Sequence, residues 1–245
     1  MMREKRKGRT TALLLTGALL LLLLATHGAW GEPVPASGLT KGESSRRNLS
    51  TTNVTSVDAQ GGNVTRLDIN GMSITKSWQG YYGNISGNII LADANNNSLY
   101  EWGNGTSVTG KVYASRNSTI SWATINCTNA SGIAAEESYL GQSASDADSV
   151  TNTFNQTDHP SFLVAGRNMT GCYSTNTFVN GAFQESHFHE ILLSDNNGRI
   201  VYTTIIDNDQ VGYDGSTHDF QLLVGENEHI GSEGATQYYF FVELG

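Results

Sequence analysis

The sequence predicts an all-β protein: a two-sheet, Greek-key-like sandwich with one or two short helices and an extended N-terminal arm. The first observation is the pattern of residue types. From Val64 onward, short runs rich in Val, Ile, Thr, Tyr and Trp are separated by Asn, Gly and Asp. The second is the close spacing of these runs, which is typical of sandwich strands. The third is an internal repeat of one hairpin pattern. A propeller or solenoid would need further copies at a fixed period, and the sequence contains none.

The first predicted element is a hairpin with strands at Val64–Ile69 and Met72–Trp78, joined by Asn70-Gly71. Asn-Gly favours this connection because both residues tolerate the positive φ angles of a type I′ turn. Further strands are predicted at 81–91, 98–102, 109–115, 118–125, 161–165, 187–194, 199–206, 218–224 and 236–244. Helical patterns are limited to 133–140 and 146–153.

The internal repeat relates residues 89–100 to residues 191–202. Each segment contains an apolar strand, an aspartate (Asp93 or Asp195), an Asn-rich turn and a strand that ends in an aliphatic residue and Tyr. Any β-hairpin can share such a pattern. We interpret the two segments as topologically similar hairpins of one sandwich.

Residues 1–31 have the pattern of a signal peptide. A basic stretch precedes an apolar run at 12–25, and Ala29-Trp30-Gly31 places small residues at a cleavage site before Glu32. Two alternatives remain open. The apolar run is either an uncleaved membrane anchor, or it follows a type IV pilin leader that is cut before Arg9.

The remainder divides into an arm and one domain. Residues 32–60 contain few large apolar groups and many Ser, Thr and Gly, so we expect an extended mobile arm. Residues 61–245 are predicted to form the β-sandwich domain, which is long enough to bury a core. With the leader removed, no stable membrane span is expected.

Eleven Asn-x-Ser/Thr sequons crowd the middle of the chain, and none follows residue 168. Such asparagines accept N-glycans when a chain is exported. We therefore expect a glycoprotein in which most of these asparagines lie on exposed strands or turns. They are Asn48, Asn53, Asn63, Asn84, Asn96, Asn104, Asn117, Asn126, Asn129, Asn155 and Asn168.

The charge of the chain is strongly acidic and uneven. The full sequence carries a net charge of −9, and residues 131–245 hold 16 acidic side chains against two basic ones. Nucleic acid is excluded as a partner, because phosphate binding needs a Lys and Arg footprint. The acidic surface indicates a solvated face that keeps the protein soluble or, alternatively, cation binding or adaptation to a salty medium.

The chain has two cysteines, Cys127 and Cys172, and we predict that they form a disulfide. An isolated even pair in an exported protein is usually bonded, and closing this loop would stabilise the fold by about 4 kcal/mol in the chain-entropy model. Two buried free thiols are the alternative. A cysteine zinc site is not predicted, because neither residue belongs to a CxxC pair.

One loop resembles the start of a calcium site. Asp207, Asp209 and Gly212 match the D-x-D-x-x-G start of such a loop and Asp214 follows two residues later, although the later ligand positions of an EF-hand are missing. An irregular site would use Asp207, Asp209 and Asp214. We predict that any bound metal is calcium at these three carboxylates, with metal-free acidic turns as the alternative. The segment from Asp93 to Glu101 shows a weaker version, which ordinary Asp-Asn turn chemistry explains.

His187 and His189 would lie on one face of a predicted strand, as two ligands of a cupin-like metal site should. The rest of that motif is absent, so two edge-strand histidines without a metal are the preferred interpretation. No serine, zinc or cysteine catalytic motif is present, and we do not predict an enzyme. A set of aromatic residues on neighbouring strands suits core filling or, alternatively, sugar stacking: Trp78, Tyr81, Tyr82, Tyr100 and Trp102.

The run Ser77–Leu91, followed by Leu99–Trp102 and Lys111–Ser115, resembles secreted β-rich surface proteins of archaea. The resemblance is specific over residues 77–115 and extends to residues 64–245 as texture only. It implies an envelope or extracellular setting with heavy N-glycosylation, and it implies no particular functional residue.

These observations together predict an exported structural or interaction protein of the cell surface or of an extracellular filament. Its expected partners are copies of itself or other surface proteins, and residues 45–65 are the expected donated strand, with a plain stalk as the alternative. A carbohydrate-binding module that recognises glycans, with or without calcium, is the second hypothesis. A metal-dependent enzyme at His187 and His189 is the third.

Overall fold

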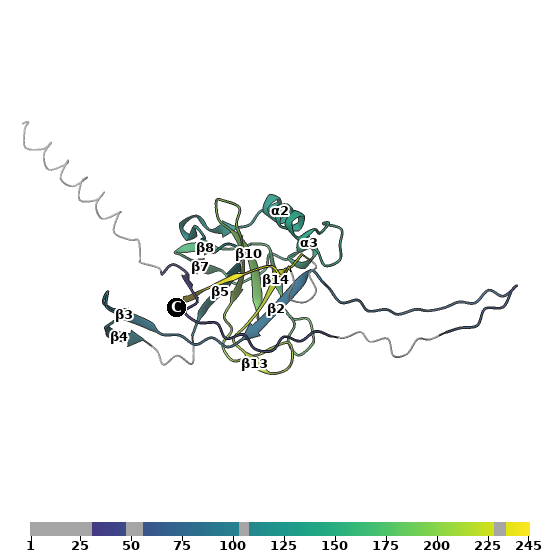
Figure 1. The fold of residues 1–245 in the computed structure, drawn as a ribbon, viewed down its shortest axis with the longest axis horizontal. Helices are drawn as coiled ribbons and strands as arrows, with labels where there is room; N and C mark the ends of the chain where they lie inside the picture. Colours follow the sequence, from purple (N-terminus) through teal and green to yellow (C-terminus); the bar gives the residue numbers. More distant parts are fainter. Residues whose placement is uncertain (1–30, 48–55, 103–107, 228–233) are drawn as a thin grey trace, which may run out of the picture.

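The computed structural model describes residues 31–47, 56–102, 108–227 and 234–245 (Figure 1). Most regular structure is antiparallel β, with two short α-helices, so the all-β prediction is confirmed. The predicted signal peptide lies outside the described residues apart from Gly31. No helix within the described ranges has the length and apolar character that a bilayer span requires.

Seven strands form the central sheet, in the order β1-β15-β5-β11-β10-β6, with β9 also paired to β10. All the pairings in this sheet are antiparallel. The strands are β1 Val34–Pro35, β5 Gly110–Ser115, β6 Asn126–Cys127, β9 Ser174–Asn176, β10 His189–Ser194, β11 Ile200–Ile205 and β15 Tyr239–Leu244.

The central sheet is buried on both faces. In β10, Ile191 and Leu193 belong to one apolar cluster, whereas Leu192 between them belongs to the other. This follows from the alternation of side chains along a strand. The first cluster is covered by the hairpin β7 Phe162–Val164 and β8 Arg167–Met169 and by the short 3-10 helix η1 Trp122–Thr124.

The second cluster is covered by both helices and by the two-stranded sheet of β2 Trp78–Gly83 and β14 Phe220–Gly225. The body therefore has three layers, and helices share one face with the smaller sheet. A two-sheet sandwich describes only part of this arrangement. A further two-stranded sheet pairs β12 Gln210–Val211 with β13 Thr217–His218.

The helices form where the sequence predicts them. Helix α2, Ala130–Leu140, begins where Asn129 Oδ1 accepts a hydrogen bond from Gly132 N, and it ends at Gly141 with φ 72°. Helix α3, Val150–Thr153, is capped by the Ser149 side chain and is shorter than the predicted segment. Most of the predicted strands from residue 98 onward also form, within one to three residues of the expected bounds.

The predicted Asn70-Gly71 hairpin was wrong. Residues 63–76 are extended but belong to no strand, and the chain turns earlier, at Gly61-Gly62. There Asn63 N donates to Gln60 O at 3.3 Å, and Gly62 takes a φ of 86°. Strand formation needs a partner as well as propensity, and no partner strand of this chain lies beside residues 63–76 in the described structure.

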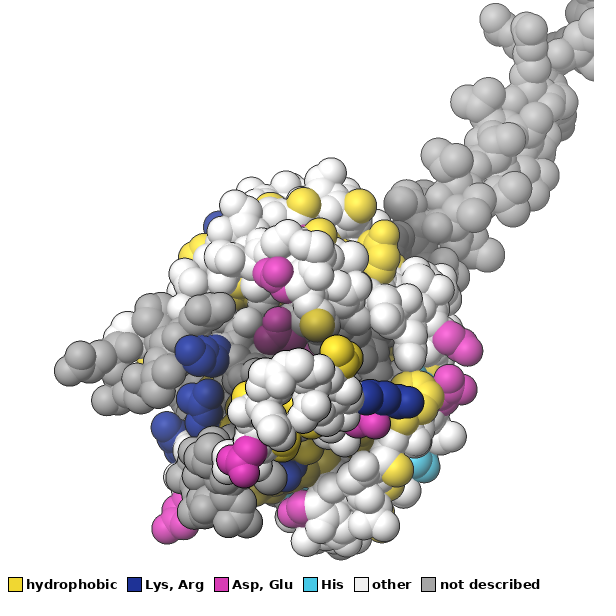
Figure 2. Space-filling model, turned by 90° about the vertical axis from the view of Figure 1, so that its right-hand side faces the viewer, with side chains coloured by type: hydrophobic (Ala, Val, Ile, Leu, Met, Phe, Trp, Pro, Cys, Tyr) yellow, Lys and Arg dark blue, Asp and Glu magenta, His cyan; other side chains and the backbone are white. Residues whose placement is uncertain are grey.

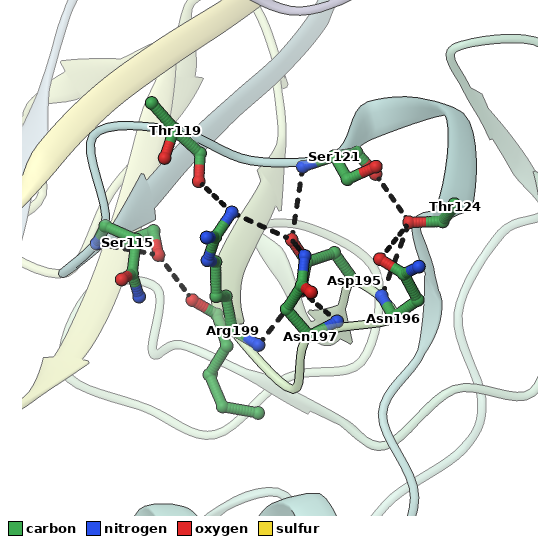
Figure 3. A network of polar contacts seen from close by, with 10 residues as sticks. Ser115, Thr119, Ser121, Thr124, Asp195, Asn196, Asn197 and Arg199 are labelled. Atoms are coloured by element: carbon green, nitrogen blue, oxygen red, sulfur yellow. Dashed lines mark hydrogen bonds and ion pairs between the residues drawn. The ribbon is translucent and has the colours of Figure 1, made fainter.

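The predicted strand at 118–125 was also wrong, for a tertiary reason. The turn between β10 and β11 holds this segment by hydrogen bonds, as Figure 3 shows. Asp195 Oδ2 accepts from Ser121 N at 3.1 Å, and Arg199 Nη1 donates to Thr119 O at 2.8 Å. The backbone groups of the segment are thus used by a neighbouring turn, and Trp122 packs against the core ring of Tyr113.

The arm differs from the prediction at its start. Val34–Pro35 form the edge strand of the central sheet, paired with Val242 and Phe241 of β15. The later described arm residues, 37–47 and 56–60, belong to no strand and are exposed, whereas Pro33 beside the edge strand is buried. Both outer strands of the central sheet, β1 and β6, are only two residues long, which leaves little edge for a donated strand.

Candidate functional site

The candidate site is a hairpin that stands clear of the body. Strand β3, Ile89–Ala92, and strand β4, Ser98–Trp102, pair only with each other (Figure 1). Their turn is built on Asp93, whose Oδ1 accepts from Asn95 N and Asn97 N, each at 2.9 Å. The Asn97 side chain donates to Oδ2 at 2.8 Å, and these hydrogen bonds lower the pKa of the Asp93 carboxyl. The aspartate is thus committed to the turn, as the turn-chemistry alternative expects.

One face of this hairpin is wholly apolar. Ile89 pairs with Trp102 and Leu91 with Tyr100, and directly opposed residues of an antiparallel ladder share a face. The four side chains are 44%, 51%, 48% and 59% exposed in that order, and the Tyr100 and Trp102 rings lie 4.9 Å apart. Monomeric proteins rarely leave so contiguous an apolar surface uncovered, so the face indicates an interaction site.

The predicted repeat supplies a comparison within the molecule. In the hairpin of β10 and β11, Asp195 Oδ1 accepts from Asn197 N at 2.9 Å and from Arg199 N at 3.1 Å, the same pattern as at Asp93. Gly198 takes the left-handed conformation with φ 74°, as Asn96 does with φ 63°. The two segments therefore form similar turns, although a bulge between Leu91 and Ala92 shifts the exposed ladder.

The two hairpins differ completely in burial. Ile191, Leu193 and Tyr202 are fully buried, while their counterparts in the exposed hairpin are about half exposed. Strand β11 pairs with β5, and β10 pairs with β6 and β9, so the buried hairpin is flanked on both sides. The exposed hairpin has the same kind of sequence and none of these neighbours among the described residues.

A second exposed apolar segment lies at the other end of the molecule. The limb, which we define as residues 63–76, leaves the Gly61-Gly62 turn and returns to β2. Figure 1 shows the limb and the β3–β4 hairpin at opposite ends of the long axis. Figure 2, which looks onto the limb's end, shows hydrophobic side chains scattered among polar and charged ones there.

His187 and His189 do not share one strand face, as the metal-site alternative would need. Phe188, between them, takes a left-handed φ of 49°, so side chains no longer alternate, and β10 begins only at His189. His187 Nδ1 lies 4.0 Å from Asp207 Oδ1, and burial lowers the pKa of His189. Both residues border the body of the protein and not the hairpin face.

The three predicted calcium carboxylates are not brought together. Asp207 Oδ2 accepts from Phe188 N at 2.6 Å, and Asp214 Oδ1 is 3.0 Å from His218 Nε2. Asp209 is held through its backbone, whose N–H donates to Asp219 Oδ1 at 2.9 Å. Within the described ranges, no three His, Cys, Asp or Glu side chains are grouped so as to hold a metal ion. The loop uses its acids for turn and ion-pair contacts instead.

The predicted disulfide is present, and it joins Cys127 at the edge of the central sheet to Cys172 before β9. Seven of the eight described sequon asparagines are exposed, and Asn117 is partly buried. Asn48, Asn53 and Asn104 lie outside the described residues. The exposed seven are Asn63, Asn84, Asn96, Asn126, Asn129, Asn155 and Asn168.

The predicted aromatic set splits into two groups. Trp78 and Tyr81 pack against the core, with the Tyr81 ring 5.2 Å from that of Phe240. Tyr100 and Trp102 lie on the exposed hairpin, and Tyr82 stacks near Tyr213. The sequence predicted strands in this hairpin but did not predict that they are exposed. An apolar run such as Ile89–Leu91 is typical of a buried strand.

Comparison with protein-family models, with curated proteins and with solved structures finds no match to this chain. The function is therefore argued from the geometry of the exposed hairpin.

Proposed function

We propose that this protein is an exported structural subunit of a cell surface or extracellular filament, and that the β3–β4 hairpin docks it to its neighbours. The observation that carries the proposal is the exposed apolar hairpin face, because the repeat equivalents of three of its four residues, Ile191, Leu193 and Tyr202, are buried in the same molecule. The partners are copies of the chain or other surface proteins.

The free energy of burial supports docking at this face. Burying a large apolar side chain fully stabilises by about 1.5–3 kcal/mol, and four such side chains are about half exposed here. A two-stranded hairpin with no other support is also only marginally stable in water. Contact with a partner would therefore order the hairpin and remove its apolar face from water.

The covalent features agree with an extracellular setting. The chain has one disulfide, a bond that persists mainly in oxidising compartments. Of the described sequon asparagines, the nearest to the hairpin in sequence are Asn84, which precedes it, and Asn96, which lies in its turn; Asn104, two residues after Trp102, lies outside the described residues. Neither belongs to the four-residue apolar face, so glycans at these positions leave that face open to a protein partner.

The test uses the full chain, secreted and glycosylated by its expression host. Threonine keeps strand propensity while removing apolar surface, so Leu91→Thr/Tyr100→Thr should leave the fold intact and weaken association. Val211→Thr is the matched control, because Val211 is equally exposed on a strand far from the hairpin in sequence. Sedimentation velocity and negative-stain microscopy measure the assembly.

We expect large assemblies from the wild type and the control, and monomers from the double variant. An unchanged size distribution for the double variant would contradict the docking role of the hairpin. So would a wild type that stays monomeric at high concentration and captures no surface protein through the hairpin.

A carbohydrate-binding module is the second candidate. The observation in its favour is the exposed Tyr100 and Trp102 ring pair, since sugars stack on such rings. Glycan-array binding that is lost in Trp102→Ala, with assembly unchanged, would place this candidate first.

A further inference from the structure

The limb has the character of an unpaired amphipathic strand. Arg66 Nη2 lies 3.0 Å from Asp68 Oδ1, and side chains two residues apart lie on the same side of an extended backbone. Leu67 and Ile69 point the other way along this backbone, and both are mostly exposed. The segment Val64–Ile69 therefore has a charged face and an apolar face.

The limb is anchored at its base and free along its length. Thr75 Oγ1 donates to Asp148 Oδ2 at 2.5 Å, and Trp78 Nε1 donates to Asp148 O at 2.6 Å. Between residues 64 and 73, no hydrogen bond joins the limb to another described part of the chain. No described residue therefore pairs with its backbone donors and acceptors, which are the groups that a partner strand would use.

We infer that Val64–Ile69 of a second copy of this chain adds as a strand to the edge of the β3–β4 hairpin, with Leu67 and Ile69 extending the hairpin's apolar face. This inference rests on the proposed function and names the occupant of its docking face. It is a case of β-augmentation, in which main-chain hydrogen bonds give affinity and alternate side chains give specificity.

The buried hairpin shows what the exposed one lacks. Strands β5 and β9 flank β11 and β10, and side chains of that ladder fill both apolar clusters. The exposed hairpin has the same kind of turn and apolar strands, and its edges have no partner strand among the described residues. The limb has an extended backbone, an apolar face and hydrogen-bonding groups that no described residue uses, so it is the described segment that fits such an edge.

Charge and position point to a second copy as the source of the strand. Residues 89–102 carry two acids and no base, whereas residues 63–76 carry two bases and one acid, so the segments have opposite net charge. The two segments lie at opposite ends of one molecule (Figure 1). A chain therefore cannot fill its own hairpin edge with its own limb in this arrangement, and a neighbour's limb can.

The contact is heterologous, because one copy gives the limb and the other gives the hairpin. Repetition of such a head-to-tail contact produces an open filament and not a closed dimer. Fourteen extended residues reach roughly 45 Å, which lets the limb reach a neighbour while the acidic bodies stay apart.

The experiment uses two defective forms of the secreted full chain. The hairpin form carries Leu91→Thr/Tyr100→Thr and keeps the limb, and the limb form carries Leu67→Thr/Ile69→Thr and keeps the hairpin. All four positions are exposed, so the fold is retained, which circular dichroism checks. Each form alone is expected to self-associate about tenfold more weakly or worse, as loss of apolar contact requires. Val211→Thr again serves as the control.

Mixing the two forms gives the decisive result. We expect a one-to-one complex that does not grow, because it has one intact limb–hairpin contact and two defective ends. If the limb form assembles alone like the wild type while the hairpin form does not, the hairpin docks to another surface, so this inference fails and the proposed function stands. If neither substitution changes assembly or partner capture, both fail.

Discussion

At the scale of single residues, the equivalent aspartates of the two hairpins differ in burial and in their hydrogen-bond partners. Asp93 and Asp195 build the same turn, but only Asp195 is buried and also binds Ser121 N of a neighbouring segment. Burial opposes ionisation of Asp195, yet hydrogen bonds from Ser121, Arg199 and Asn197 outweigh it and lower the pKa. The network of Figure 3 therefore depends on an ionised carboxylate.

We predict that Asp195→Ala lowers the free energy of unfolding by about 3 kcal/mol, because it leaves the part-buried N–H groups of Ser121, Asn197 and Arg199 without an acceptor. Asp93→Ala should cost less than about 1 kcal/mol, since water can satisfy the donors of the exposed turn. Urea denaturation measures both variants. Equal losses would show that the two turns are equally coupled to the body.

Glu190 is an acid in an apolar setting. Its side chain is fully buried on β10, its Oε2 accepts from Leu223 N at 2.8 Å, and its Oε1 has no partner among the described residues. Burial raises the pKa of this carboxyl well above its ordinary value of 4.5. Because the folded pKa is the higher one, the stabilising contribution is complete below pH 4.5 and is lost as the pH rises through the folded value.

Glu190→Gln should therefore reduce the loss of unfolding free energy between pH 4 and pH 8. We expect this loss to be smaller in the variant than in the wild type by more than about 1 kcal/mol. Glutamine keeps an acceptor for Leu223 N and cannot ionise. Denaturation across this pH range measures the effect, with the exposed Glu185→Gln as control. Parallel pH profiles for Glu190→Gln and wild type would contradict the burial argument.

At the scale of elements, Asn129 has two roles that can be separated. Its Oδ1 caps helix α2, and the residue is also a sequon asparagine. Asn129→Ala removes both roles, whereas Ser131→Ala removes only the sequon. We predict a loss of about 1 kcal/mol in unfolding free energy for Asn129→Ala beyond that of Ser131→Ala. Equal losses in thermal or urea unfolding would mean that the cap contributes nothing.

Elements whose signal is local were predictable from sequence. The repeat identified two hairpins with the same turn, because Asp93 and Asp195 act on their own next four residues. The helix at 133–140 and the disulfide were predicted for similar reasons, since capping and an isolated cysteine pair need no knowledge of the neighbours.

Elements whose structure depends on contacts with other segments of the chain were not predictable from sequence. Residues 118–125 have strand propensity, but the Asp195 carboxylate accepts a hydrogen bond from the backbone N–H of Ser121 within this segment. The Asn70-Gly71 turn has the right residues, but no partner strand lies beside it. Phe188 in a left-handed conformation separates the two histidines, and nothing in its sequence context signals that geometry. The exposure of the hairpin face depends on the absence of a covering layer, which a run of apolar residues does not reveal.

At the scale of the whole molecule, the described chain separates a stable body from two exposed segments. The body has a central sheet that the described chain itself covers on both faces, and its edge strands are short. The hairpin and the limb hold 10 of the 20 large apolar side chains that are exposed in the described structure. The segments that are left uncovered are therefore the ones we expect to assemble.

The most direct measurement of this claim is hydrogen exchange on the secreted full chain, compared between assembled and dilute monomeric protein. We predict slower exchange on assembly at residues 89–102 and 64–69, where new ladder hydrogen bonds form, with the central sheet unchanged. Exchange at the hairpin and limb that is the same in both states would contradict the account.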